Sequence, residues 1–354
     1  MQRNADLRAV LDRFSRARIA VVGDLVADEY IYGETDRVSR EAPVLIVRYE
    51  SSDLKLGCAA NAVANLCALG ARVSPVGLVG EDLIGERLRE LLREAGAGVD
   101  GVLTASGLPT ATKTRVLAGG KNTRRQQMLR IDRDGPRAPP ASLFLGRLLG
   151  ALKAAAREAD AIMVSDYGLG LLSAPVIEAV LGLARSGKIV CVDSRFGLSQ
   201  YRGVTMAKPN EVELAQLSGR ALGELSALEA DGRDLLRTLH AGALLVTRGR
   251  SGMVLLRPGV PTAVLPVHGS AEAVDVTGAG DTVMAASTLA LACGADPLQA
   301  ARLANVAGAL VVQKPGTATV AGAELRKELL RAQVAEAELV ETAQESPRRR
   351  RERR

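Results

Sequence analysis

The chain is poor in aromatic residues, cysteine and histidine. Aromatic side chains make up 2% of its 354 residues and tryptophan is absent, so alanine, leucine and valine must build the core. Small aliphatic residues favour a layered α/β architecture over an aromatic-rich β-sandwich. The four cysteines form no CxxC pair and the two histidines stand alone, so neither a disulfide framework nor a zinc site is expected.

A long uncharged apolar run is also missing. Charged residues interrupt the first twenty positions and break any signal-peptide core, and no later stretch has membrane-spanning length. We therefore expect a cytoplasmic protein with no membrane partner. The 47% apolar content is ample for a sizeable core, in one large domain or two ordinary ones.

Positive charge is concentrated in the last residues. The net charge is +6, and residues 348–354 hold six arginines and one glutamate, which give +5. The rest of the chain is nearly neutral, and the absence of aromatic residues among the arginines speaks against nucleic-acid binding. We interpret residues 331–354 as a charged, disordered tail; a targeting or anionic-surface role is the alternative.

The apolar pattern of residues 1–330 predicts an α/β fold. Strands are expected at 18–23, 161–165, 189–193, 205–208 and 244–247, and helices at 59–69, 145–159, 175–186, 231–239 and 282–293, with two more beginning at 210 and 322. From residue 145 onward helices and strands alternate. This alternation predicts βαβ crossovers and a doubly wound, mostly parallel sheet flanked by helices.

Two β-rich stretches, approximately 30–55 and 110–132, interrupt this pattern. The second holds two extended segments, 112–117 and 127–131, joined by Ala-Gly-Gly-Lys-Asn. We expect both stretches to form a separate small β-sheet, which we call the lid.

The most informative motif is Val274-Asp-Val-Thr-Gly-Ala-Gly-Asp281, which an apolar run follows. The two glycines permit a sharp turn, and the amides of residues 278–280 can approach an anion at the start of a helix. Asp281 would lie in the first helical turn, where the helix macrodipole should keep its pKa near the solution value of about 3.9 and the carboxylate charged. The alternative reading is an ordinary strand-to-helix turn with an acidic first-turn residue.

Three further motifs follow expected strands. Asp24 stands at the carboxyl end of the first strand, where open α/β sheets bind ligands. Asn210 and Glu213 could simply cap a helix, and Thr247-Arg-Gly-Arg-Ser-Gly252 could be an ordinary glycine-rich turn. No Walker A motif is present, so any phosphate must be bound by helix amides instead of a P-loop.

The motif that ends at Asp281 resembles the second signature of the PfkB, or ribokinase-like, carbohydrate kinases, usually Asp-Thr-Thr-Gly-Ala-Gly-Asp. The resemblance implies a ribokinase-like fold and an ATP-dependent sugar kinase, in which Asp281 is the catalytic base and the amides of Gly278, Ala279 and Gly280 form the anion hole. It also implies that Asp275 and Gly316 help to hold a monovalent cation such as K⁺.

The resemblance gives roles to the other motifs on the nucleotide side. Asn210 and Glu213 would organise Mg²⁺ and the nucleotide phosphates, Glu213 through a water molecule, because Mg²⁺ prefers hard oxygen ligands and retains waters. The implied ATP contacts are Thr247, Gly249, Gly252 and Asn305.

On the acceptor side, Gly57-Cys58-Ala-Ala-Asn61 resembles the first family signature, Gly-Gly-Ala-x-Asn. Asp24 and Asn61 would then bind sugar hydroxyls. Cys58 replaces the second glycine, and a side chain at this position restricts the backbone of the turn.

From about residue 18 to about 320, the chain most resembles the family members that phosphorylate D-glycero-β-D-manno-heptose 7-phosphate at its anomeric hydroxyl. The resemblance implies a role in ADP-heptose and lipopolysaccharide core synthesis. The segments that carry it are 23–30, 37–43, 113–116, 126–132 and 165–168. Further substrate residues implied are Asp28, Gly57, Asp166 and Asp193, with Lys113, Arg115, Arg130 and Arg195 as candidate cations for the sugar phosphate.

The chain departs from this pattern at two places. Leu169 stands where a lysine is usual, and Ser194-Arg195-Phe196 replaces Pro-Lys-Gly, so another phosphosugar or a free sugar is the rival acceptor. A catalytically silent sugar-phosphate sensor or a scaffold is the rival of another class.

The resemblance also implies partners. These are a second copy of the chain bound through the lid, and a separate nucleotidyltransferase, since the chain has the length of the stand-alone form.

Overall fold

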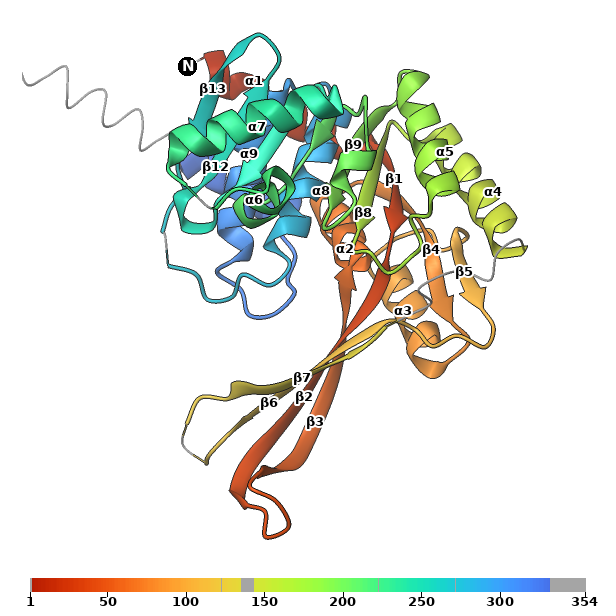
Figure 1. The fold of residues 1–354 in the computed structure, drawn as a ribbon, viewed down its shortest axis with the longest axis vertical. Helices are drawn as coiled ribbons and strands as arrows, with labels where there is room; N and C mark the ends of the chain where they lie inside the picture. The colour runs from red at the N-terminus through yellow and green to blue at the C-terminus, as the bar shows by residue number, and fades with distance from the viewer. Residues whose placement is uncertain (1, 122, 135–142, 222, 271, 332–354) are drawn as a thin grey trace, which may run out of the picture.

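A nine-stranded sheet forms the centre of the protein (Figure 1). The computed structural model describes residues 2–121, 123–134, 143–221, 223–270 and 272–331. The strands of the central sheet are, in spatial order, β13 (Val260–Leu265), β12 (Met253–Arg257), β11 (Leu244–Thr247), β10 (Met206–Ala207), β9 (Ile189–Ser194), β8 (Ala161–Asp166), β1 (Arg18–Gly23), β4 (Arg72–Gly80) and β5 (Val102–Ala105). In this spatial order the strands from β11 to β5 are all parallel, and β12 and β13 add antiparallel at one edge. The predicted α/β fold with a mostly parallel sheet is confirmed.

Helices cover both faces of this sheet. Alternate residues of each strand point to opposite faces, so Ile19 and Val21 pack in one apolar cluster while Ala20 and Val22 pack in the other. The first cluster contains residues of α1 (Gln2–Leu11), α2 (Ala59–Leu69), α3 (Leu83–Glu94), α8 (Ala279–Ala292) and α9 (Pro297–Val311). The second contains residues of α4 (Leu143–Glu158), α5 (Ala174–Arg185), α6 (Glu211–Ser218) and α7 (Leu225–Leu239).

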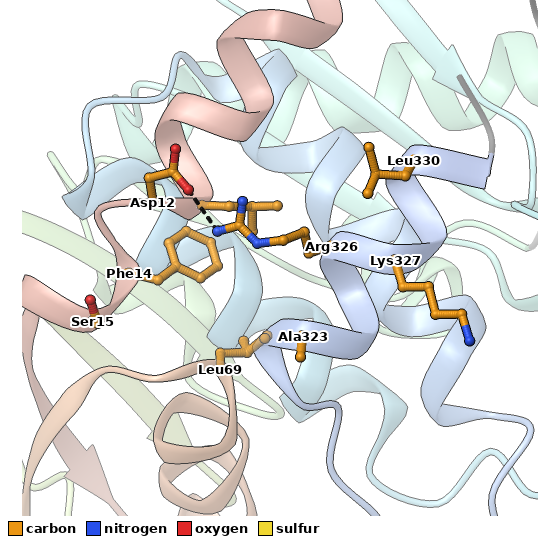
Figure 2. A pocket seen from close by; sticks show the side chains of 10 residues that line it. Asp12, Phe14, Ser15, Leu69, Ala323, Arg326, Lys327 and Leu330 are labelled. Carbon is orange, nitrogen blue, oxygen red and sulfur yellow. Dashed lines mark hydrogen bonds and ion pairs between the residues drawn. The ribbon is translucent and has the colours of Figure 1, made fainter. Parts of the chain in front are cut away.

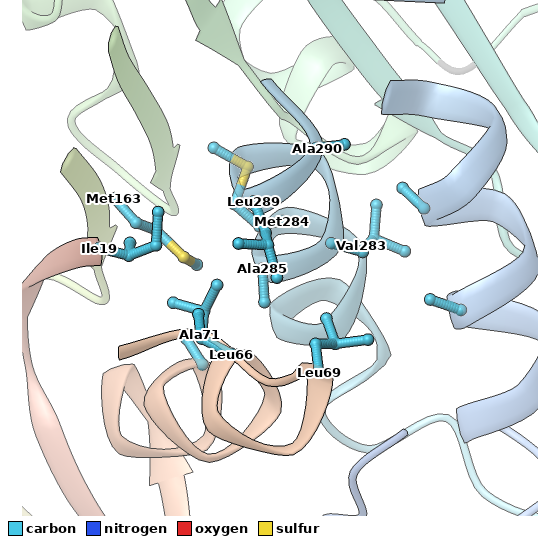
Figure 3. Close-up of a cluster of buried hydrophobic side chains, with 14 of the residues drawn as sticks. Ile19, Leu66, Leu69, Ala71, Met163, Val283, Met284, Ala285, Leu289 and Ala290 are labelled. Carbon is cyan, nitrogen blue, oxygen red and sulfur yellow. The ribbon is translucent and has the colours of Figure 1, made fainter. Parts of the chain in front are cut away.

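Helix α8 is buried along almost its whole length. Its small residues let it pack between the sheet, α2 and α9, and Figure 3 shows Met284 and Ala285 facing Leu66 of α2 and Met163 of β8. The first helical turn is thereby fixed at the edge where the parallel strands end.

The lid is a four-stranded sheet that extends away from the body as a long twisted ribbon (Figure 1). Its strands are β3 (Leu45–Cys58), β2 (Leu25–Val38), β6 (Thr112–Gly119) and β7 (Gln126–Arg133), in that order. Strands β2 and β6 are parallel, and the two outer pairs are antiparallel. The expected bounds of 30–55 were too short, because β2 follows β1 almost directly and β3 runs into α2.

Other boundaries also differ from the expectation. Helix α7 begins six residues before 231, and the strand expected at 205–208 is the two-residue β10. A helix spans 322–331, so the predicted tail at 331–354 lies outside the described residues except for Arg331. None of the helices in the described ranges has the length and apolar character needed to cross a bilayer.

Candidate active site

Asp281 lies in the first turn of α8, as its motif predicts. Gly278 is the N-cap with φ +77°, and a Cβ there would lie 2.4 Å from Nδ2 of Asn61, so both the backbone conformation and the space require glycine. The amides of Gly278, Ala279 and Gly280 therefore stand at the N-terminus of a buried helix, where anions bind favourably, although the Ala279 amide donates to the Val276 carbonyl at 3.2 Å.

The carboxylate of Asp281 is buried, and each of its oxygens accepts a hydrogen bond. It is 3% exposed; Oδ1 accepts a hydrogen bond from the Tyr167 hydroxyl at 2.7 Å, and Oδ2 accepts one from Nδ2 of Asn61 at 2.9 Å. Burial raises the pKa of Asp281 to about 7, although these two hydrogen bonds oppose the shift. The expectation of a pKa near the solution value was wrong, because loss of solvent outweighs the stabilisation that the helix N-terminus provides.

A buried ion pair stands beside the motif. Nζ of Lys208, which follows β10, lies 2.9 Å from Oδ2 of Asp193 at the end of β9. Desolvation would lower the pKa of Lys208, but Asp193 outweighs it and the lysine stays protonated. A Cβ on Gly280 would lie 3.5 Å from this Nζ. Sequence reasoning gave Lys208 no role, although it lies two residues before Asn210.

A cleft of about 770 Å³ opens on one side of the α8 N-terminus. Its walls include Val276, Val283 and Val312, which give it an apolar side suited to a nucleobase. The sequence-predicted residues that line it are Thr247, Gly249, Gly252, Ala279, Gly280 and Asn305. The glycine-rich turn, part of the α8 motif and Asn305 therefore meet at one cleft, whereas Asn210 and Glu213 do not line it. Asn305 also donates to the Pro266 carbonyl at 2.7 Å.

Asn210 and Glu213 form a reciprocal capping box at the start of α6. Oδ1 of Asn210 accepts from the Glu213 amide at 2.8 Å, and Oε2 of Glu213 accepts from the Asn210 amide at 2.9 Å. Asn210 also bridges to Thr247 of the cleft wall. Burial raises the pKa of Glu213, with Asp193 adding to the shift. The capping box uses Oδ1 of Asn210 and Oε2 of Glu213, and the part of the chain that the structure describes holds no group of three or more His, Cys, Asp or Glu side chains that could ligate a metal directly. This arrangement leaves contact through water as the way for Glu213 to act on Mg²⁺.

Asp275 and Gly316 meet behind the motif. Oδ2 of Asp275 accepts from the Gly316 amide at 2.8 Å, and Oδ1 accepts from the Thr277 amide at 2.9 Å. Burial would raise the pKa of Asp275, but the bonds from Thr277 and Gly316 outweigh it and lower the value. The charged carboxylate of Asp275 thus joins the loop before α8 to the loop at Gly316, and these two loops would surround a monovalent cation.

On the acceptor side, the carboxylates are occupied by protein donors. Oδ2 of Asp24 accepts from the amides of Tyr167 and Leu169, at 2.8 and 3.2 Å, and burial raises its pKa to about 6. Asp166 accepts from the Ser194 and Tyr201 hydroxyls at 2.7 and 3.0 Å. These carboxylates hold the loop after β8 in place through the amides of residues 167–169.

The turn at the first signature keeps a glycine conformation despite its cysteine. Cys58 has φ +52° and ψ −127°, a region that L side chains rarely adopt. Gly57 faces the Asp28 carboxyl group, and a Cβ there would lie 2.7 Å from its Cγ. The turn is thus as tight as the family signature implies, and Cys58 is held in it under strain.

The four candidate cations differ in position. Lys113 contacts Sγ of Cys58 at 3.0 Å, and Arg115 pairs with Asp28 at 2.8 Å, so both lie at the base of the lid near Asp281. Arg130 pairs with Asp132 on the exposed outer strand. Arg195 is exposed, with its guanidinium 5.9 Å from the Phe196 ring.

A second cavity, of about 450 Å³, lies between segment 11–15 and the helix at 322–331 (Figure 2). Arg326 crosses its edge and pairs with Asp12 at 2.7 Å. No sequence-predicted site residue lines it. The described residues therefore place the predicted chemistry at the α8 N-terminus and not here.

Comparison with known proteins agrees with this geometry. The family model described as "pfkB family carbohydrate kinase" matches residues 17–322. Three proteins named "Bifunctional protein HldE" are 40% identical: over 291 residues in Citrifermentans bemidjiense, 287 in Methylococcus capsulatus and 299 in Caulobacter sp.. The matches cover 80 to 83% of this chain but only 58 to 59% of those proteins, so the chain spans less than two thirds of their length.

Solved structures share the fold. Arabidopsis thaliana ribokinase in complex with ribose and ATP superposes with a TM-score of 0.71 at 22% identity, covering 88% of this chain and 98% of that one. Escherichia coli phosphofructokinase-2 with substrates and products gives 0.71 at 17% identity, covering 89% and 99%. The kinase motif lies beside the cleft, the family model matches most of the chain, and the fold is that of the solved sugar kinases. The chain therefore belongs to the PfkB family of carbohydrate kinases and is an ATP-dependent sugar kinase.

Proposed function

We propose that this kinase transfers the γ-phosphoryl group of ATP to the anomeric hydroxyl of D-glycero-β-D-manno-heptose 7-phosphate. The sugar oxygen bonds to the γ-phosphorus, the bond to ADP breaks, and the hydroxyl proton passes to Asp281. The product is the 1,7-bisphosphate, a precursor for ADP-heptose and lipopolysaccharide core synthesis. The observation that carries the proposal is the position of Asp281: it directly follows Ala279 and Gly280, which line the cleft, and its carboxylate accepts from Asn61 and Tyr167.

Asp281 is suited to act as the base because its pKa is about 7. A base is most effective when its pKa lies near the working pH, and phosphoryl transfer asks mainly that the hydroxyl be oriented and its proton accepted late. The amides of Gly278, Ala279 and Gly280 would meet the negative charge of the transferred group.

The metal sites are part of the same proposal. Glu213, through water and with Asn210 beside it, would hold Mg²⁺, and Asp275 with the Gly316 loop would hold K⁺. Bound Mg²⁺ would supply neutralisation of charge on the phosphates. Thr247, Gly249, Gly252 and Asn305 would contact ATP, because they line the cleft.

The heptose acceptor is supported by the relatives named HldE and by the cations at the base of the lid. Lys113 and Arg115 would bind the sugar phosphate, with Arg195 as a further candidate cation. Asp24, Asp28, Asn61, Asp166 and Asp193 would orient the hydroxyls. Another phosphosugar or a free sugar is favoured only by the departures at Cys58, Leu169 and residues 194–196.

Replacement of the base tests the mechanism. Asp281→Asn should lower kcat by roughly 10²- to 10⁴-fold, because the base and its charge disappear together. Calorimetric ATP binding should persist, since the cleft is unchanged. Asp234→Asn, on the exposed face of α7, is the matched control and should turn over normally. Normal turnover by Asp281→Asn would refute this assignment and would leave the sensor or scaffold reading.

The acceptor is tested by comparing kcat/KM for heptose 7-phosphate, fructose 6-phosphate and ribose. We expect heptose 7-phosphate to be strongly preferred. A preference for ribose would remove the heptose assignment while leaving the kinase intact.

We also propose a cytoplasmic homodimer formed through the lid, with a separate nucleotidyltransferase acting on the product. The lid exposes an unusual number of apolar side chains, namely Val38, Val44, Leu45, Ile46, Tyr49, Met128, Leu129 and Ile131. Leu129→Asp should shift the protein to a monomer in light scattering. Leu83→Asp, an exposed leucine of α3, should not. A wild-type monomer with full activity would rule out the dimer.

A further inference from the structure

The proposed base cannot be reached by an acceptor hydroxyl as it stands. Asp281 is 3% exposed, and each carboxylate oxygen already accepts a hydrogen bond from the protein. A base must lie within about 3 Å of the proton that it accepts. Each oxygen keeps a second lone pair, but burial leaves an acceptor hydroxyl no open path to it, so we infer that one of the two partner side chains moves aside when the acceptor binds.

Asn61 is the partner that is fixed. Its Oδ1 and its carbonyl oxygen both accept from Nδ2 of Asn65, at 3.1 and 3.0 Å, and Oδ1 of Asn65 accepts from Thr282 at 2.9 Å. This network ties α2 to α8 inside the core. Moving the Asn61 side chain would break several buried hydrogen bonds at once.

Tyr167 is the partner whose side chain can move. Its amide donates to Oδ2 of Asp24 at 2.8 Å, so the loop after β8 stays in place and only the side chain has to turn away. Its hydroxyl makes one hydrogen bond, to Asp281. Nζ of Lys113, on the lid strand β6, lies 4.9 Å from the centre of its ring. Any movement of Lys113 toward a sugar phosphate would also release this ring.

We propose that the Tyr167 hydroxyl is a placeholder for the acceptor hydroxyl: it donates to Asp281 in the empty enzyme and is exchanged for the sugar when the acceptor binds. Both groups are O–H donors to the same carboxylate oxygen, so the exchange keeps the base satisfied in both states. Tyr167 is thus a positioning residue, and the inference rests on the proposed role of Asp281.

The groups around Asp281 set the direction of the expected pH effects. Tyr167 and Asn61 donate to it, and the pair Asp193 and Lys208 acts on it from β9 and the end of β10. Cys58 and Lys113, from the two lid strands that reach the site, lie against Tyr167. The Tyr167 hydrogen bond lowers the pKa of Asp281. Loss of this bond should therefore raise the pKa of Asp281 in the free enzyme, where the bond exists, and not in the enzyme–substrate complex, where it has been exchanged.

Tyr167→Phe tests the exchange, because it removes one oxygen and leaves the ring. The pH profile of kcat/KM reports the free enzyme and that of kcat reports the enzyme–substrate complex. With heptose 7-phosphate as acceptor, the acidic limb of kcat/KM should move up by roughly one pH unit, while that of kcat stays in place. At about pH 9, the acceptor KM should fall roughly three- to tenfold, because its competitor is gone.

Tyr201→Phe is the matched control, since Tyr201 also donates a buried hydrogen bond to a carboxylate, that of Asp166. Tyr201→Phe should lower the melting temperature without moving the acidic limb of the pH profile of either kcat/KM or kcat. If the acidic limbs of kcat/KM and kcat moved equally in Tyr167→Phe, the hydrogen bond between Tyr167 and Asp281 would persist in the complex. If neither limb moved, this bond would not form in solution. Either result overturns the proposal.

Calorimetry gives a second measurement that does not depend on turnover. Tyr167→Phe should tighten heptose 7-phosphate binding in the wild-type background but not in Asp281→Ala, where there is no carboxylate to compete for. Tightening in both backgrounds would contradict the exchange. If Asp281→Asn instead retained turnover, the proposed base would be wrong, which these data distinguish from failure of the exchange alone.

Discussion

The nucleotide side and the acceptor side of the site are built in different ways. The nucleotide side is an open cleft shaped largely by backbone, with the α8 N-terminus and the turn at Gly249–Gly252 as its main parts. The acceptor side consists of buried side chains from β1, the lid, α2 and the loops after β8 and β9, each already paired with another protein group. A backbone site is ready to bind, whereas the side-chain site must exchange partners.

The chain departs from its family on both sides. Cys58, Leu169 and Phe196 stand on the acceptor side, and Val276, where the family motif has threonine, lines the nucleotide cleft. Backbone contacts require only glycine or a helix start. Acceptor contacts depend on which side chains meet, and there a changed residue can change the sugar.

Breaking the ion pair between Lys208 and Asp193, which lies next to both the nucleotide side and the acceptor side, should have the largest effect on stability. Lys208→Met leaves Asp193 charged and buried without a partner and should cost about 3–5 kcal/mol of the free energy of unfolding in denaturant titrations. The double variant with Asp193→Asn should recover most of this loss. If the single variant were no less stable than the double, the pair would contribute nothing.

The pKa of Asp281 should appear in the pH dependence of stability. Its folded pKa of about 7 lies above the unfolded value of 3.8, so the folded state binds this proton more tightly. The stability it contributes is complete below about pH 4 and is lost as the pH rises to about 7, by roughly 2–4 kcal/mol. Asp281→Asn should remove this slope. An unchanged slope in urea unfolding at several pH values would contradict the shifted pKa.

Two glycines sharpen the view that backbone builds the nucleotide side. Gly252 has φ +80°, and a Cβ would lie 2.1 Å from the Leu265 carbonyl oxygen, whereas Gly249 has φ +51° and open space around it. Gly252→Ala should therefore cost about 2 kcal/mol more than Gly249→Ala, and only it should raise the KM for ATP strongly. Equal stabilities and equal KM values would show that the close approach is unimportant.

The strain at Cys58 should give the smallest effect. Cys58→Gly and Cys58→Ala both remove the sulfur, but only glycine adopts φ +52° without penalty. Relief of strain exceeds the entropy cost of glycine, so Cys58→Gly should be more stable than Cys58→Ala by about 1 kcal/mol in thermal unfolding. The reverse order would mean that the turn relaxes when the side chain changes.

Local patterns predicted a large part of this molecule. The helix at 59–69 and the strands at 18–23 and 244–247 were placed to the residue, because their apolar spacing and bounding glycines are local signals. The edge strands β12 and β13 and the helix α3 received no prediction. The length of the lid was also underestimated, since pairing between distant strands and not their sequence decides where they end.

In the candidate site, too, local motifs were predicted and contacts between distant residues were not. Gly278 to Asp281 and the residues of the nucleotide cleft were identified from motifs, whose geometry is fixed within a few residues. Lys208 and Tyr167 were missed as contributors, because their importance comes from partners 15 and 114 residues away along the chain.

The sequence by itself determined the α/β fold, the lid as a separate sheet and the helix start that carries Asp281, because strand alternation, helix periodicity and glycine turns act over short distances. Only the tertiary structure decided that Asp281 is buried, that its pKa is about 7 and that Tyr167 occupies it. Desolvation depends on everything packed around a group, and no local pattern encodes that surrounding.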